Sequence, residues 1–171
     1  MSKNYRLACM AADESIKSDL GFKHGAIIYK GTKKICSGYN QGARTIYRKN
    51  LCCSTHAEMD VVCKFLNSFI KIHSIKDKDK IRRKMSKYSI CVVRCVTHLN
   101  GDVHLLNSPP CLDCLQKLKL IGLNKVIYSV NGNTVNIQQI NRIDINDHQL
   151  CGVMKRIDVL NNMRIKPLIH Y

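Results

Sequence analysis

The chain has 171 residues, with 28 Lys or Arg and 12 Asp or Glu, so its formal net charge is +16. This length predicts one domain over residues 1–171, and 45% apolar residues suffice for a buried core. The composition excludes a disordered chain, a collagen and a pure coiled coil. No apolar run approaches the roughly 18 residues of a membrane span, and the N-terminus lacks a signal-peptide pattern. We therefore expect a cytoplasmic protein with no membrane partner.

The ten cysteines and the basic charge are the two unusual features of the composition. Without a signal peptide, cysteines at this density favour metal binding or catalysis over a disulfide framework. The charge allows two interpretations. It indicates a nucleic-acid or nucleotide partner, because a field of Lys and Arg concentrates phosphates, or it reflects the base composition of the coding DNA.

The first half of the chain predicts a helix, a hairpin and a second helix. A helix is expected over Tyr5–Leu20, because apolar or small side chains recur there and Gly21 follows. Two short runs, Ala26–Tyr29 and Ile35–Tyr39, flank a Gly-Thr turn and predict a β-hairpin. Apolar residues then recur at helical spacing over Met59–Ile70, which predicts a buried helix face.

The stretch Lys71–Lys87 carries a run of Lys and Arg with only two Asp. It is predicted to be an exposed insertion. A solvated, partly helical loop is the favoured interpretation, and a dedicated nucleic-acid surface is the alternative.

The second half of the chain alternates strands and helices, with Asn-Gly pairs at two turns. This order predicts an α/β fold with one mixed sheet. The expected elements are strands over Tyr88–Val96, Val103–Leu106, Val126–Val130 and Thr134–Ile137, a helix over Leu112–Ile121 ended by Gly122, and a helical tail over Asp147–Met163.

Two short motifs carry the chemistry: Thr55-His56-Ala57-Glu58, at a helix start, and Pro110-Cys111-Leu112-Asp113-Cys114, at another. An imidazole and two thiolates are ligands that zinc prefers, and three protein ligands leave a fourth position for water. Cysteines three residues apart on a helix lie on one face. The sequence therefore predicts a catalytic Zn²⁺ site, with Glu58 as the carboxylate placed to move protons.

Each half of this pattern has a simpler interpretation. Thr55 and Glu58 have the spacing of a capping box, and His56 alone would suit a protein core. The two thiols could be buried, or could form half of a structural zinc site that Cys52 or Cys53 completes. The occurrence of both motifs in one chain, each opening a helix, favours zinc catalysis.

His-Ala-Glu followed by Pro-Cys-x-x-Cys resembles the zinc-dependent cytidine deaminase superfamily, which includes nucleoside, deoxycytidylate, tRNA adenosine and polynucleotide cytidine deaminases. Two further segments, His24–Ile28 and Ser37–Asn40, are similar to the first hairpin of that family. The resemblance spans about residues 5–130.

The resemblance implies a three-layer α/β fold, in which helices flank a mixed five-stranded sheet whose last strand is antiparallel. It implies hydrolytic deamination of a cytosine nucleotide or nucleoside, with release of ammonia, by an enzyme that forms homo-oligomers. The implied roles are zinc ligation by His56, Cys111 and Cys114, proton transfer by Glu58, and substrate contacts from Asn40, Ala57, Ser108 and Pro109.

The substrate is indicated less directly. His as first ligand is similar to deoxycytidylate and tRNA deaminases, whereas the turn at residues 131–133 is similar to the nucleoside branch. Arg44 and Arg48 lie in an expected active-site loop, where guanidinium groups would suit a phosphate. The scarcity of aromatic residues favours a free nucleotide of dCMP or CMP type over tRNA or single-stranded nucleic acid. A catalytically silent zinc-stabilised binding module is the third hypothesis, and the intact Glu58 argues against it.

Overall fold

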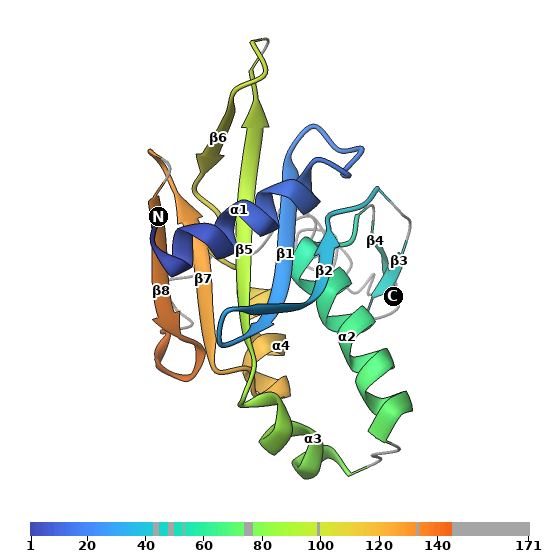
Figure 1. Ribbon diagram of the computed structural model, residues 1–171. Helices are drawn as coiled ribbons and strands as arrows, with labels where there is room; N and C mark the ends of the chain where they lie inside the picture. Colours follow the sequence, from blue (N-terminus) through green and yellow to red (C-terminus); the bar gives the residue numbers. More distant parts are fainter. Residues whose placement is uncertain are drawn as a thin grey trace, which may run out of the picture.

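Figure 1 shows a computed structural model of the chain, which describes residues 1–42, 45–47, 50–52, 54–73, 77–98, 100–132 and 134–144. The expected tail helix, Arg44, Arg48 and Cys53 lie outside the described residues. The helices are α1 (Lys3–Ser15), α2 (Ala57–His73), α3 (Lys78–Met85), α4 (Leu112–Ile121) and the short 3₁₀ helix η1 (Ile140–Arg142), and the strands are β1 (Lys23–Lys30), β2 (Lys33–Tyr39), β3 (Thr45–Tyr47), β4 (Asn50–Cys52), β5 (Ser89–Thr97), β6 (Val103–Leu106), β7 (Lys125–Val130) and β8 (Thr134–Gln139).

The main sheet has the strand order β2-β1-β5-β7-β8, and β6 forms an additional pair with β5. All its pairs are antiparallel except β5 with β7. The predicted mixed sheet of five strands and its antiparallel last strand are therefore confirmed, and β6 makes a sixth strand. A separate two-stranded sheet joins β3 and β4.

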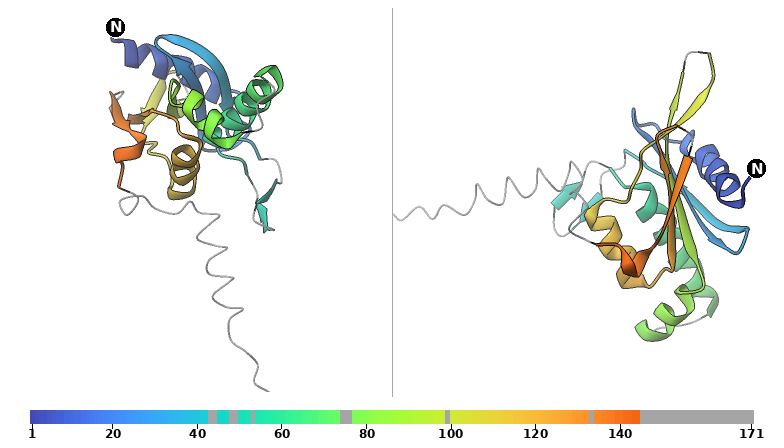
Figure 2. Two further views of the ribbon diagram at one scale, coloured as in Figure 1. Left: turned by 90° about the horizontal axis from the view of Figure 1, so that it is seen from below. Right: turned by 90° about the vertical axis from the view of Figure 1, so that its left-hand side faces the viewer.

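Helices cover both faces of the sheet (Figure 2). Side chains alternate along β1: Ala26 and Ile28 pack with α2, α3 and α4, whereas Ile27 and Tyr29 pack with α1. The expected three-layer arrangement is thus confirmed. In the residues that the structure describes, no helix is both long enough and apolar enough to cross a membrane.

Helix α1 ends at Ser15, so the expectation that it continues to Leu20 was wrong. Beyond its end, the Ser18 hydroxyl donates to the Asn40 carbonyl at 2.8 Å. The Lys23 ammonium donates to the carbonyl of Ser18 at 2.9 Å. These side-chain bonds to the backbone replace the helical ladder. They attach the chain between α1 and β1 to the end of β2.

The described part of the basic stretch Lys71–Lys87 is largely helical and mostly exposed, in agreement with the favoured interpretation, but one of its faces is buried. Its first residues continue α2 to His73, and Lys78–Met85 form α3. Met85 is fully buried, and Ile81, one turn earlier, is half-buried against the same core. Residues four apart share one face of a helix, so α3 covers the core with its apolar side and exposes its basic side.

The end of α4 is where the sequence placed it. Gly122 has a φ of 87°, and its N–H donates to the carbonyls of Leu118 and Lys119. A Cβ at this position would lie 2.6 Å from Cγ of Arg82. Glycine is therefore required both by the left-handed backbone and by the close approach of α3.

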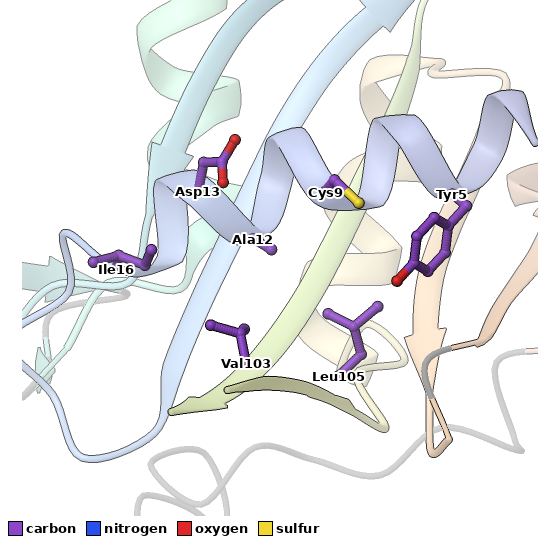
Figure 3. Close-up of a pocket in the computed structure, with 7 residues that line it drawn as sticks. All are labelled: Tyr5, Cys9, Ala12, Asp13, Ile16, Val103 and Leu105. Carbon is purple, nitrogen blue, oxygen red and sulfur yellow. The ribbon is translucent and has the colours of Figure 1, made fainter. Parts of the chain in front are cut away.

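A cavity of about 180 Å³ lies between α1 and β6 (Figure 3). Its lining comes from the α1 face of the sheet, so none of the motif residues reaches it. The lining residues are Tyr5, Cys9, Ala12, Asp13, Ile16, Val103 and Leu105.

Candidate metal centre and active site

The first motif lies at the start of α2, where the Asp60 N–H donates to the His56 carbonyl at 2.9 Å. The start of α2 packs closely against β2 at Gly38, because a Cβ there would lie 2.6 Å from the Asp60 carboxylate and 2.7 Å from the Val61 nitrogen. The same carboxylate accepts the Tyr39 N–H at 3.1 Å. The end of β2 therefore fixes the position of His56.

The second motif lies at the start of α4 in an equivalent way. The Leu115 N–H donates to the Cys111 carbonyl at 2.9 Å, so Cys111 caps the helix with its backbone. Its thiol makes no capping hydrogen bond. Cys114 follows in the first turn and is 1% exposed. Both helices thus direct their N-termini, with the positive ends of their dipoles, toward one centre.

The segment before Cys111 is held by a buried pair of serines. The Ser108 hydroxyl lies 3.1 Å from the Val92 carbonyl and 2.8 Å from the Ser129 hydroxyl. The Ser129 N–H donates to the Ser108 hydroxyl at 3.2 Å, and the Ser129 hydroxyl donates to the Leu106 carbonyl at 2.6 Å. This network joins β5, β6 and β7 to the segment 107–111, which leads into α4. Ser108 therefore positions the second motif.

The three predicted zinc ligands converge. Nδ1 of His56 lies 3.5 Å from the Cys111 thiol and 3.4 Å from the Cys114 thiol. Within the described part of the chain, these three residues are the group whose ligand atoms all lie within 4.8 Å of one another. One imidazole and two thiols in this arrangement could bind a metal ion.

The chemistry of these donors fits zinc, which prefers nitrogen and sulfur ligands. The hydrogen bond from Cys111 lowers the pKa of Cys114, but burial and the carboxylates of Glu58 and Asp113 raise it, and the net shift is upward. A cation at this position would reverse that effect, because it stabilises thiolates. Cys52 and Cys53, the alternative ligands of a structural site, are not among the residues whose side chains the structure describes.

Glu58 lies in the first turn of α2 and is 6% exposed. Its carboxylate makes no ion pair with any residue in the described ranges. Thr55 does not bond to it: the backbone of Thr55 pairs with Gln41 through N–H···O bonds of 2.9 and 3.1 Å. The capping box that the spacing allowed is therefore not formed. The Glu58 carboxylate acts electrostatically on the thiol of Cys114, one of the three candidate ligands.

The other predicted contacts are spread around this centre. Ala57 is fully buried, and Pro109 is exposed. The Asn40 amide accepts from the His24 N–H at 2.7 Å and donates to the Phe22 carbonyl at 2.6 Å. Asn40 thus attaches the end of β2 to the start of β1.

Sequence reasoning assigned no role to His24 and Arg94, which are paired across β1 and β5. Burial lowers the pKa of His24, and the Glu58 carboxylate acts in the opposite direction. The sequence feature that could have drawn attention to this pair is Arg94, a charged residue inside the apolar run Tyr88–Val96.

Comparisons with known proteins place this geometry in context. No family model matches the sequence, and no curated protein matches it. Among solved structures, cytidine deaminase from Burkholderia pseudomallei is similar, with a TM-score of 0.56 and 16% identity, over 82% of this chain and 94% of that one. The chain has the cytidine deaminase fold. The fold implied by the two motifs is thereby confirmed.

Two structures of dCMP deaminase from the cyanophage S-TIM5 are also similar. The apo form has a TM-score of 0.45 at 20% identity, covering 75% of this chain and 83% of that one. The complex with dCMP and dUMP has a TM-score of 0.38 at 19% identity, covering 72% and 76%. We base the assignment of the cytidine deaminase fold on the Burkholderia structure alone.

Proposed function

We propose that the chain is a zinc-dependent hydrolytic deaminase that converts a cytosine nucleotide or nucleoside, of dCMP or CMP type, to its uracil form with release of ammonia. The observation that carries this proposal is the convergence of His56, Cys111 and Cys114 at two helix starts, with the buried carboxylate of Glu58 beside them. The cytidine deaminase fold supports it.

In this proposal His56, Cys111 and Cys114 hold the metal. Zinc, when bound with three protein ligands, acts as a Lewis acid and lowers the pKa of water in the open position. Glu58 would take a proton from the attacking water and deliver it to the ring nitrogen beside the reacting carbon. It would then take the remaining proton of the newly formed C–OH group and deliver it to the leaving amine, so that ammonia and the uracil carbonyl result. The N-termini of α2 and α4 supply dipoles that are in place before the reaction, so no reorganisation is needed.

The remaining contacts are proposals of the same kind. Asn40 would use the hydrogen-bonding capacity that its two backbone bonds leave over to hold the sugar, and Ala57 would offer its backbone to the base. Pro109, exposed next to Ser108, would line the entrance. Arg44 and Arg48 are proposed to hold a phosphate and lie outside the described residues.

The test is deamination followed by ultraviolet absorbance, with zinc-loaded protein and a panel of cytidine, deoxycytidine, CMP, dCMP, dCTP and a cytosine-containing single strand. Turnover of dCMP or CMP above the matching nucleoside would support the proposal. Absence of turnover on every cytosine compound, with zinc bound, would overturn it.

A deaminase of tRNA or single-stranded nucleic acid is the second candidate. The net charge of +16 favours it, as do the exposed Arg82, Arg83 and Lys84 on α3. Such an enzyme would lose affinity steeply with salt, because each neutralised phosphate releases counterions. Activity on the strand alone, falling by orders of magnitude between 50 and 200 mM salt, would select this candidate.

A further inference from the structure

Arg94 is a charged residue in a strand whose neighbours are buried and mostly apolar. In β5 it is half-buried, while residues 89–93 are all buried. Ile90 and Val92 pack into the core formed with α2 and α4. Because side chains in a strand alternate between faces, Arg94 lies on that same face. It therefore shares a face of the sheet with the candidate metal centre.

Arg94 is connected by hydrogen bonds and strand pairing to both of the segments that carry the candidate metal ligands. On one side its N–H donates to the Ser129 hydroxyl at 3.1 Å, and Ser129 holds Ser108, which leads to Cys111. On the other side it pairs with His24, whose backbone exchanges hydrogen bonds with Asn40.

From there the path to the first ligand is short. Gln41 follows Asn40 and pairs with Thr55, the residue before His56. Arg94 is thus linked to both motifs, through Ser129 on one side and through His24 on the other.

The guanidinium group of Arg94 has unused capacity. Its Nε is buried and has no hydrogen-bond partner among the described residues, and the group makes no ion pair with them. Its carbon lies 4.5 Å from the centroid of the Phe22 ring, which is 65% exposed. The ring orients the guanidinium by a cation–π contact but offers no acceptor to its Nε–H. The Nε–H of this half-buried guanidinium is therefore a donor that an acceptor group could still use.

We propose that Arg94 binds the phosphate of a free cytosine nucleotide whose base occupies the zinc site. The planar guanidinium matches two phosphate oxygens, whereas a neutral nucleoside offers nothing that balances the charge. The inference rests on the proposed deaminase function and adds its substrate class: the enzyme acts on a nucleoside phosphate in preference to a nucleoside. It also places a phosphate contact on the sheet, independent of Arg44 and Arg48.

The experiment compares zinc-loaded wild type with the variants Arg94→Ala, Arg94→Gln and Arg94→Lys, using dCMP and deoxycytidine. Arg6→Ala is the matched control, because Arg6 is exposed on α1 across the sheet. Removing the guanidinium should lower kcat/KM for dCMP on the order of 10- to 100-fold and leave deoxycytidine within about threefold. Arg94→Lys should recover part of the loss, since it keeps the charge without the fork. Arg94→Gln provides the same comparison if Arg94→Ala does not fold.

A binding measurement separates this inference from the proposed function. Calorimetric titration of dCMP into zinc-loaded Glu58→Gln, with and without Arg94→Ala, detects the phosphate contact without turnover. Weaker dCMP binding in the double variant, with deoxycytidine binding unchanged, supports Arg94 even if the wild type deaminates nothing. Equal losses for dCMP and deoxycytidine, no loss, or turnover of the single strand alone would overturn it.

Discussion

The two faces of the sheet use the chain's two glutamates in opposite ways. On the α1 face, Glu14 is 7% exposed, and its carboxylate pairs with Lys17 at 2.6 Å and Lys34 at 3.3 Å. On the face of α2 and α4, Glu58 is 6% exposed, and no described residue pairs with its carboxylate. Similar burial thus accompanies a carboxylate held by two ion pairs on one face and a carboxylate without an ion pair among the described residues on the other. A buried carboxylate without an ion pair is typical of functional sites.

The cysteines repeat this contrast. Cys91 and Cys95 lie among apolar side chains under α1, and burial raises the pKa of each. Such thiols behave as small hydrophobic residues. Cys111 and Cys114 instead lie at a helix start beside an imidazole. The same residue type thus has different surroundings on the two faces of the sheet. Substitutions on the α1 face should therefore change stability, whereas substitutions on the face of α2 and α4 should change metal binding or turnover.

The largest expected effect is on turnover. Glu58→Ala should lower kcat by about 10²- to 10⁴-fold, because general acid–base catalysis contributes that much, while bound zinc stays at the wild-type level. Glu14→Ala on the opposite face should leave kcat within about twofold. Deamination rates measured alongside metal content check both. A Glu58→Ala enzyme with substantial activity would show that another group moves the proton.

The next effect is on metal content. Cys114→Ser should lower zinc affinity by more than the roughly 10- to 100-fold that outer-shell changes cause, because it removes a thiolate ligand. Cys91→Ser, a matched substitution at a buried thiol on the other face, should retain full zinc. Elemental analysis after equal zinc loading distinguishes the two. Equal zinc in both variants would rule out Cys114 as a ligand.

A smaller effect is expected on stability at the serine network. Ser129→Ala removes the partner of the Arg94 N–H and of the Ser108 hydroxyl, and should lower the free energy of unfolding by about 1–3 kcal/mol. Ser86→Ala, which removes an exposed hydroxyl bonded to the Arg83 carbonyl, should change it by less than about 0.5 kcal/mol. Urea unfolding measures both. Equal effects would mean that the network does not stabilise the junction.

The smallest effect is electrostatic and depends on pH. Burial raises the pKa of Glu14, but the hydrogen bonds from Lys17, Ser37 and Lys34 together lower it by more than burial raises it. The net pKa therefore lies below its ordinary value of 4.5. A lowered folded-state pKa contributes stability above the unfolded pKa, and this is lost as pH falls through the folded value. Glu14→Gln should therefore destabilise by up to about 1 kcal/mol at pH 7. The gap to wild type should narrow below pH 4.5, as unfolding at both pH values will test.

What the sequence predicted well was local. Gly122 ended α4 as expected, and the turn before β8 reversed the chain into an antiparallel last strand. The two motifs of the candidate metal centre were also local, since each lies within one helical turn. The predicted end of α1 was wrong because the true end depends on a hydrogen bond between Ser18 and Asn40. These two residues are 22 positions apart in sequence and meet only in the fold.

The burial of Met85 and the position of Arg94 were missed for a related reason. In the basic run, two apolar residues, Ile81 and Met85, form one face of α3, and the core residues that this face contacts are distant in sequence. For Arg94, strand pattern alone gives alternation but does not identify the neighbouring strand. Its partner, His24, precedes it by seventy residues, so only the register of β1 with β5 brings the two together.

The candidate ligands His56 and Cys111 are 55 residues apart in sequence. An ion that binds both residues closes a long loop of the chain, which includes α3 and the β5–β6 hairpin. Closing this loop in the unfolded chain would cost much conformational entropy, so the ion binds mainly to the folded state. Binding to the folded state alone therefore stabilises the protein, by about 2.7 kcal/mol at a free metal concentration of 100 Kd. The thermal midpoint should rise with added zinc. It thus reports occupancy of the centre without any substrate and distinguishes a lost ion from lost chemistry.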